Sequence, residues 1–217
     1  MRRVTDVRLD AWRGLDDRAK RALDVSVATV LLVLTSPIQL AAAIAIRVRL
    51  GSPVLFRQAR PGLDQEPFEM IKFRTMLGDE PAPGVVDAPS RMTPFGHWLR
   101  STSIDELPTL WNILRGDMSL VGPRPLMMQY LRLYSPEQAR RHEVRPGITG
   151  LAQVSGRNAL SWEDKFRLDV DYVDDHSFAG DLKIILATAS SVLRRDGISP
   201  DGENTMPEFF GTDEAHP

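Results

Sequence analysis

The chain has 217 residues and a mass of 24.3 kDa, which is enough for one domain with a core of its own. Hydrophobic residues make up 42% and charged residues 26%, which excludes bulk disorder, and the absence of cysteine excludes disulfides, thiolate metal sites and a cysteine nucleophile. The net charge is −2, and no sequence signature of a nucleic-acid-binding fold is present. We therefore expect an oxygen or nitrogen nucleophile and no nucleic-acid partner.

The N-terminal quarter holds the strongest compositional signal. Residues 1–21 are expected to be a leader, either an amphipathic interfacial anchor or a loose tail. Residues 25–46 carry no charge, and as a straight helix they would be about 33 Å long, enough to span a bilayer. Pro37 removes a backbone hydrogen bond in the middle of this run, and Ser36 can re-bond the freed carbonyl. We predict a helix–break–helix within residues 22–50, with its break at Ser36-Pro37.

Three interpretations of this apolar run are open: a re-entrant hairpin, a single transmembrane span and a cleaved signal peptide. The run is long for a signal peptide, and the preceding segment contains four acidic residues. A single span should have more basic residues on its cytoplasmic side, but this run is basic at both ends. The charge symmetry favours a re-entrant hairpin with both ends in the cytoplasm.

The remainder reads as one mixed unit, residues 51–193, followed by an acidic and flexible tail, residues 194–217. Residues 53–57 and 67–74 are predicted to form a hairpin around a turn at 60–64. Residues 78–91 are rich in proline and glycine and predict a mobile loop. Apolar spacing predicts helices over 95–114, with a break near Pro108, and after Ser161 and Asp181 as caps.

Adjacent carboxylates at Asp105 and Glu106 are the first candidates for chemistry. If Asp105 were the N-cap of a helix, Pro108 would fall in the first turn, where its missing N–H costs nothing. The pair would then lie at a helix N-terminus, close to free N–H groups that can receive phosphate oxygens. The alternative is a purely structural capping box that pairs Ser103 with Glu106, or Thr102 with Asp105.

Several basic residues could bind an anion near these carboxylates. Arg124 lies between Pro123 and Pro125, which restrict the backbone and would present its guanidinium rigidly, as a pyrophosphate clamp requires. Lys72 and Arg74 should point to the same side of their strand, and Arg100 lies just ahead of the carboxylates. These three residues are candidate neighbours of the site: Lys72, Arg74 and Arg100. Each could equally be a solvated surface charge.

Taken together, these motifs closely resemble the bacterial sugar transferases called monotopic phosphoglycosyl transferases. The resemblance extends from about Lys20 to Leu193. The motifs that carry it are, in order, Lys72-Phe-Arg-Thr-Met76, Phe95-Gly-x-x-Leu-Arg100, Thr102-Ser-Ile-Asp-Glu-Leu-Pro108, Trp111-Asn, Gly116-Asp-Met-Ser-Leu-Val-Gly-Pro-Arg-Pro125, Arg145-Pro-Gly-Ile-Thr-Gly150 and Ser155-Gly-Arg-Asn158.

The resemblance implies transfer of a sugar 1-phosphate from a UDP-sugar to undecaprenyl phosphate, with Mg²⁺ required. It implies that Asp105 is a covalent nucleophile, that Asp105 and Glu106 are the candidate metal ligands, and that Pro123-Arg124-Pro125 recognises the nucleotide. For Glu106 the sequence does not separate metal binding from proton handling. It also brings Arg145 into the expected substrate-binding set and makes the break at Ser36-Pro37 re-entrant. The implied location is the cytoplasmic face of the bacterial inner membrane, and the oligomeric state is left open.

The expected fold is α+β and mostly helical: a monotopic membrane protein with a re-entrant N-terminal helix and a small cytoplasmic β-hairpin. The alternative function is a non-catalytic, membrane-tethered module that recruits partners through its arginine-rich middle and acidic tail. A further alternative is direct displacement, in which Asp105 only binds metal.

Overall fold

The computed structural model describes residues 4–78, 91–156, 160–194 and 208–211, and of residues 4–16 and 192–194 it describes the backbone alone. The fold is mostly helical, as predicted, and it contains two small sheets where one hairpin was expected. The predicted loop at 78–91 lies mostly outside the described residues, as do residues 157–159 and most of the tail. In chain order the elements are α1 (Val4–Arg49), β1 (Leu55–Pro61), η1 (Leu63–Gln65), β2 (Pro67–Phe73), α2 (Pro94–Ser101), η3 (Ile104–Thr109), α3 (Leu110–Arg115), β3 (Ser119–Val121), η4 (Met128–Leu133), α4 (Pro136–Ala139), η5 (Arg140–His142), β4 (Gly147–Thr149), α5 (Leu151–Ser155), α6 (Trp162–Asp175) and α7 (Phe178–Arg194).

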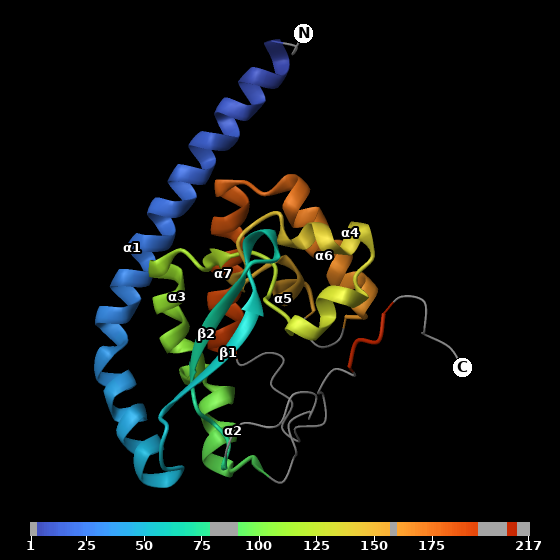
Figure 1. Ribbon diagram of the computed structural model, residues 1–217. Helices are drawn as coiled ribbons and strands as arrows, with labels where there is room; N and C mark the ends of the chain where they lie inside the picture. The colour runs from blue at the N-terminus through green and yellow to red at the C-terminus, as the bar shows by residue number, and fades with distance from the viewer. Residues whose placement is uncertain (1–3, 79–90, 157–159, 195–207, 212–217) are drawn as a thin grey trace.

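Helix α1 is one continuous helix, so the predicted interruption at Ser36-Pro37 is wrong. Pro37 lies inside the helix, where its missing N–H would leave the Val33 carbonyl without a partner. Ser36 Oγ donates to that same carbonyl at 2.8 Å, which confirms the role predicted for Ser36. Because the lost bond is replaced from the neighbouring residue, the helix continues through the proline. Figure 1 shows it curving along one side of the molecule.

One flank of α1 is apolar and open to the surroundings. Residues Asp17–Arg49 are long and apolar enough to cross a membrane, and only 11% of their most apolar stretch is buried. Among the exposed side chains are Val33, Leu34, Leu40 and Ile44. The hydroxyl groups of this stretch bond within the helix, as when Thr35 Oγ1 donates to the Leu31 carbonyl. An apolar surface of this size with internally satisfied polar groups is typical of contact with lipid.

Both ends of the apolar stretch attach to the same folded unit. Near its start, Asp24 is buried and accepts hydrogen bonds from Ser119 Oγ and Leu120 N. Near its end, Ile46 is fully buried in a cluster with Phe73 and Leu99. Unlike a removed signal segment, α1 therefore belongs to the core.

The predicted hairpin is confirmed, and a second sheet was not foreseen. Strands β1 and β2 pair antiparallel from Leu55↔Phe73 to Pro61↔Pro67. Strands β3 and β4 form a parallel pair, which needs close backbone approach. A Cβ added at Gly147 would lie 2.1 Å from Gly122 N, so the pair depends on glycine. This sheet supports the loop that carries Arg124.

Of the two helix N-caps predicted at Ser161 and Asp181, one is confirmed and the other is wrong. Ser161 caps α6 as expected, because its side chain accepts from Asp164 N. Asp181 is not a cap: α7 begins at Phe178, and Asp181 is buried in its first turn. Its carboxylate accepts a hydrogen bond from Lys20 Nζ of α1 at 2.6 Å and another from the Tyr172 hydroxyl at 2.8 Å. The local sequence predicts that Asp181 caps a helix, but in the structure its carboxylate pairs with Lys20 and Tyr172.

This pairing should anchor α1. Lys20→Met would leave the Asp181 carboxylate buried without its cation, and we expect the free energy of unfolding to fall by about 3 kcal/mol. Urea unfolding of detergent-solubilised protein measures it. The matched control is Arg18→Met on the exposed side of the same helix, expected to change stability by less than about 0.5 kcal/mol. Equal effects of the two substitutions would contradict the anchoring role.

Candidate active site

The chain after β2 brings two carboxylates to one end of the hairpin. Helix η3 begins at Ile104, and Ser103 precedes it with a left-handed φ of 55°. The predicted N-cap at Asp105 is therefore wrong, although Asp105 and Glu106 do lie in the first turn. The helix is of the tighter 3₁₀ type up to Thr109, which accommodates Pro108 inside it.

Neither capping-box alternative is present. Ser103 makes no side-chain cap bond, and Thr102 Oγ1 donates instead to the carbonyls of Trp98 and Leu99. The two carboxylates are thus not consumed by capping their own helix.

Helix η3 and α3 are locked onto β2 by two buried polar side chains. Thr109 Oγ1 donates to the Ile71 carbonyl at 2.8 Å, and Asn112 Oδ1 accepts from Ile71 N at 3.0 Å. Asn112 Nδ2 also donates to the Glu69 carbonyl at 2.7 Å. These bonds fix the next strand residue, Lys72, beside η3. Asn112 belongs to the Trp111-Asn motif, but the sequence offered no role for it.

Glu106 is the centre of the site. Its Oε1 accepts a hydrogen bond from Lys72 Nζ at 2.7 Å and another from Arg124 Nη2 at 2.7 Å. Burial alone would raise the pKa of Glu106, but the charges of Arg124 and Lys72 outweigh it and hold that pKa well below the usual range. Glu106 is therefore ionised, and it joins the hairpin to the Pro123-Arg124-Pro125 segment.

Asp105 has a contrasting environment. It is 8% exposed, and no residue in the described part of the chain donates a hydrogen bond to its carboxylate. Burial and the neighbouring charge of Glu106 raise the pKa of Asp105 to about 6, against the opposing charges of Lys72, Arg100 and Arg124. A carboxylate that is ionised near neutral pH and accepts no hydrogen bond from the described residues is available as a nucleophile or a metal ligand.

The basic side chains at this site are held in place by their surroundings. Burial lowers the pKa of Lys72, although the Glu106 charge opposes that shift. Arg124 keeps its side chain 46% exposed, while the flanking prolines are buried. Its carbonyl accepts from Arg141 Nη2 at 2.7 Å. Arg124 is thus fixed by its backbone and open at its guanidinium, as predicted for a clamp.

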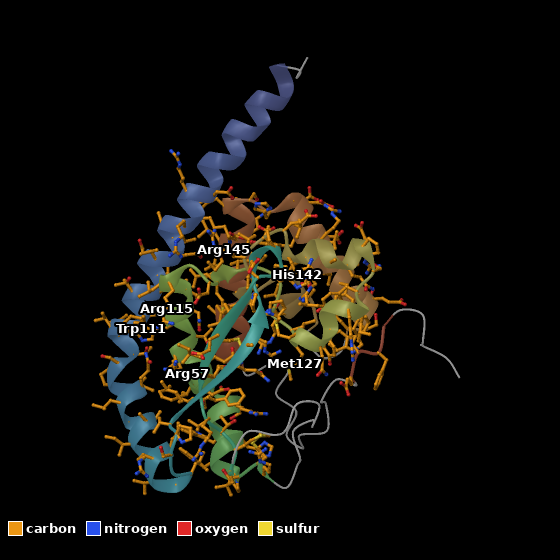
Figure 2. The ribbon with its side chains drawn as sticks, in the orientation of Figure 1. Arg57, Trp111, Arg115, Met127, His142 and Arg145 are labelled. Carbon is orange, nitrogen blue, oxygen red and sulfur yellow. The ribbon has the colours of Figure 1, made fainter. Side chains whose placement is uncertain are left out.

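Three expected basic residues differ in where they lie. Arg100 is exposed, donates to Thr75 Oγ1 at 3.0 Å, and its charge reaches Asp105. Arg74 does not lie beside Lys72, because strand β2 ends at Phe73. The Arg74 guanidinium donates instead to the carbonyls of Leu50 and Ser52. Arg145 donates to the Gly116 carbonyl just after α3, at the other end of the η3–α3 segment from the carboxylates; Figure 2 labels it above Arg115 in that view. The structure therefore groups Lys72, Arg100 and Arg124 with the dyad.

Sequence reasoning missed one buried ion pair behind the site. Arg141 donates through Nε and Nη2 to Asp169 Oδ2, at 3.0 and 2.7 Å, and both side chains are almost fully buried. Arg141 is adjacent to Arg140, whose side chain is a third exposed and pairs with surface carboxylates. Nothing in the sequence distinguishes the two arginines, because the difference is the direction each takes from η5.

The environment of Asp105 predicts a stability effect that depends on pH. The pKa of Asp105 is raised to about 6 in the folded protein, whereas in the unfolded chain it is near 4. The ionised carboxyl therefore destabilises the fold above pH 6, and this penalty disappears as the pH falls from about 6 to about 4. At pH 7.5 we expect Asp105→Asn to raise the free energy of unfolding by on the order of 2 kcal/mol. At pH 4 the gain should largely disappear. Chemical unfolding at both pH values, without substrate or metal, measures the difference; a loss of stability at pH 7.5 would contradict it.

Comparison with known proteins agrees with this arrangement. Residues 15–195 match the family described as bacterial sugar transferase. The chain is 52% identical over 194 residues to the uncharacterized sugar transferase EpsL of Bacillus subtilis, covering 89% of this chain and 96% of that protein. It is 46% identical over 191 residues to the UDP-glucose:undecaprenyl-phosphate glucose-1-phosphate transferase of Caulobacter vibrioides, covering 83% of this chain and 72% of the relative.

A third relative is the exopolysaccharide production protein ExoY of Rhizobium meliloti, which is 37% identical over 205 residues, or 86% of this chain and 91% of that protein. The Escherichia coli protein with the same name as the Caulobacter transferase is longer, and the match covers 40% of it. The family match and the identity across nearly the whole of EpsL, together with the grouped carboxylates and cations, establish that this chain belongs to the bacterial sugar transferase family.

Proposed function

We propose that this protein transfers a sugar 1-phosphate from a UDP-sugar to undecaprenyl phosphate through a covalent intermediate on Asp105. The observation that carries the proposal is the buried Asp105 carboxylate, which has no hydrogen-bond donor among the described residues and lies beside two cations that Glu106 holds. UDP-glucose is the first donor to test, because the Caulobacter relative is named for it.

In the first step a carboxylate oxygen of Asp105 attacks the β-phosphorus of the donor. A bond forms between that oxygen and phosphorus, the bond to the bridging oxygen breaks, and UMP leaves with the electron pair. In the second step a phosphate oxygen of the lipid attacks the same phosphorus and the Asp105 carboxylate leaves. No proton or water is consumed, and the two anionic substrates need not occupy the site together.

The cations offset the negative charge that these steps bring together. Arg124 has a half-exposed guanidinium next to Glu106, so its remaining donors can receive the diphosphate. Lys72 donates to the same Glu106 oxygen as Arg124, and Arg100 adds positive charge near Asp105. Glu106 orients Lys72 and Arg124 and keeps them from binding Asp105 itself, which leaves the nucleophile free.

The residues present fit a Mg²⁺ ion, because Asp105 offers an unbonded carboxylate and Glu106 uses only Oε1 in the hydrogen bonds described. Two protein carboxylates with substrate phosphates and water completing the shell are typical of Mg²⁺. The ion would supply charge stabilisation for the diphosphate.

We further propose a re-entrant arrangement on the cytoplasmic face of the bacterial inner membrane. Support comes from α1, whose apolar stretch attaches at both ends to the same unit through Asp24 and Ile46. A helix so held cannot place its ends on opposite sides of a bilayer without unfolding the body. Its exposed flank would enter one leaflet and bring Asp105 towards the lipid phosphate.

The catalytic proposal predicts release of UMP by purified protein supplied with UDP-glucose, Mg²⁺ and undecaprenyl phosphate. Asp105→Asn should lower turnover at least about 10³-fold, and Glu106→Gln about 10- to 100-fold. The control is Glu69→Gln, on the exposed face of β2, which should retain turnover. Full turnover in Asp105→Asn would rule out the covalent role; no UMP from any UDP-sugar would favour the non-catalytic module.

The covalent step has its own test. With donor labelled in the sugar and no lipid present, label should remain on denatured wild-type protein and be absent from Asp105→Asn. Turnover without trapped label would favour direct displacement, in which Asp105 only binds metal.

Metal removal tests the proposed ion. Excess EDTA should reduce UMP release to below about 1% of its rate, and added Mg²⁺ should restore it, because the diphosphate charge would otherwise be uncompensated. Unchanged release in EDTA would contradict the metal requirement.

Single cysteines test the topology, since the chain has none of its own. Cysteines introduced at Trp12 and Arg60 should both react with a membrane-impermeant reagent from the cytoplasmic side only. Reaction from opposite sides would establish a spanning helix.

A further inference from the structure

Part of the tail, residues 208–211, is docked against the catalytic unit, although it lies beyond residue 195, where the family match ends. Phe209 is 4% exposed, and its ring is surrounded by four others. Ring centroids lie 5.0 Å away at Phe166, 5.5 Å at Trp162, 5.7 Å at Tyr130 and 6.0 Å at Tyr134. Residues 194–217 are expected from the sequence to be an acidic, flexible tail, whereas residues 208–211 make specific contacts in the structure.

The docking also has polar contacts. The backbone N–H of Phe209 donates to the Tyr130 hydroxyl at 3.4 Å, and Gln129 Nε2 donates to Glu208 Oε1 at 2.7 Å. The next residue, Phe210, is 63% exposed. The segment thus inserts one specific aromatic side chain.

Two of the rings that contact Phe209 also hold Arg141. The Arg141 guanidinium lies 5.7 Å from the ring centres of both Tyr134 and Phe166. Its Nη1 donates to the Tyr134 hydroxyl at 3.3 Å. With Asp169 on its other side, the guanidinium is fixed by aromatic packing and one buried carboxylate.

Arg141 in turn holds the backbone of Arg124. Its Nη2 donates to the Arg124 carbonyl at 2.7 Å, and Arg124 Nη2 reaches Glu106 beside the nucleophile. Because prolines on both sides restrict this segment, fixing the Arg124 carbonyl sets the point and direction from which the Arg124 side chain leaves the backbone towards Glu106. Contacts therefore connect the tail to the dyad through Phe166 or Tyr134, Arg141 and Arg124.

We propose that Phe209 is a positioning residue for donor binding: it packs the rings that orient Arg141, and Arg141 sets the placement of Arg124. The proposal rests on the proposed function, in which Arg124 binds the donor phosphates. Without the Phe209 ring, a cavity opens beside Phe166 and Tyr134, and these rings can relax away from the guanidinium. The C-terminal segment is then part of the donor site although it does not touch the donor.

The test compares steady-state UMP release by full-length Phe209→Ala, Phe209→Leu and Phe210→Ala. If Arg124 binds donor equally in the ground and transition states, the KM for UDP-glucose in Phe209→Ala rises about 3- to 10-fold with kcat unchanged. The KM for undecaprenyl phosphate also stays unchanged. Phe209→Leu keeps most of the side-chain volume, so its KM for UDP-glucose should lie between those of wild type and Phe209→Ala. Phe210→Ala changes an exposed neighbour, so its KM for UDP-glucose should match that of wild type.

A merely structural role would give a different result. Loss of folded protein lowers apparent kcat and leaves the donor KM alone; that outcome, or no change at all, overturns the proposal. If Phe209→Ala does not fold, Phe209→Leu carries the comparison by the same criteria. Arg124→Lys separates the two proposals: a raised donor KM there with a normal one in Phe209→Leu and Phe209→Ala rejects the link to the tail and retains the donor role of Arg124.

Discussion

The site depends on one carboxylate, that of Glu106, which accepts hydrogen bonds from both Lys72 and Arg124. Lys72 comes from the hairpin and Arg124 from a loop after β3, so this oxygen joins parts of the chain that are far apart in sequence. Glu106 takes both bonds, and Asp105 next to it accepts no hydrogen bond from the part of the chain that the structure describes. Adjacent acidic residues in the same helical turn thus acquire pKa values shifted in opposite directions.

The arrangement carries an energetic cost that is confined to the site. Burial and the Glu106 charge raise the pKa of Asp105 to about 6, while the paired Glu106 shifts the other way. Two acidic groups whose pKa values are pushed apart are typical of active sites, where stability is exchanged for reactivity. The buried Arg141–Asp169 pair and the bonds of Asn112 to β2 supply the rigidity around them.

Helix α1 combines the contacts of a core helix with the surface of a membrane helix. Near one end, the partly buried Lys20 and the buried Asp24 make specific hydrogen bonds to the body. The apolar residues between its two attachment points, such as Val33 and Leu34, are exposed. This inverts the pattern of a soluble helix, and it lets one element hold the folded unit and present an exposed apolar flank.

The sequence by itself determined the elements that local patterns specify: the long apolar helix and the repair by Ser36, the hairpin, the helix at Ser161 and the placement of Asp105-Glu106 in a first turn. Motif order identified the family. Tertiary structure alone decided that α1 continues through Pro37, that Asp181 pairs with Lys20, that Arg74 leaves the site and that Phe209 docks behind Arg124. These outcomes depend on contacts between residues distant in sequence, whose geometry no local period or spacing encodes.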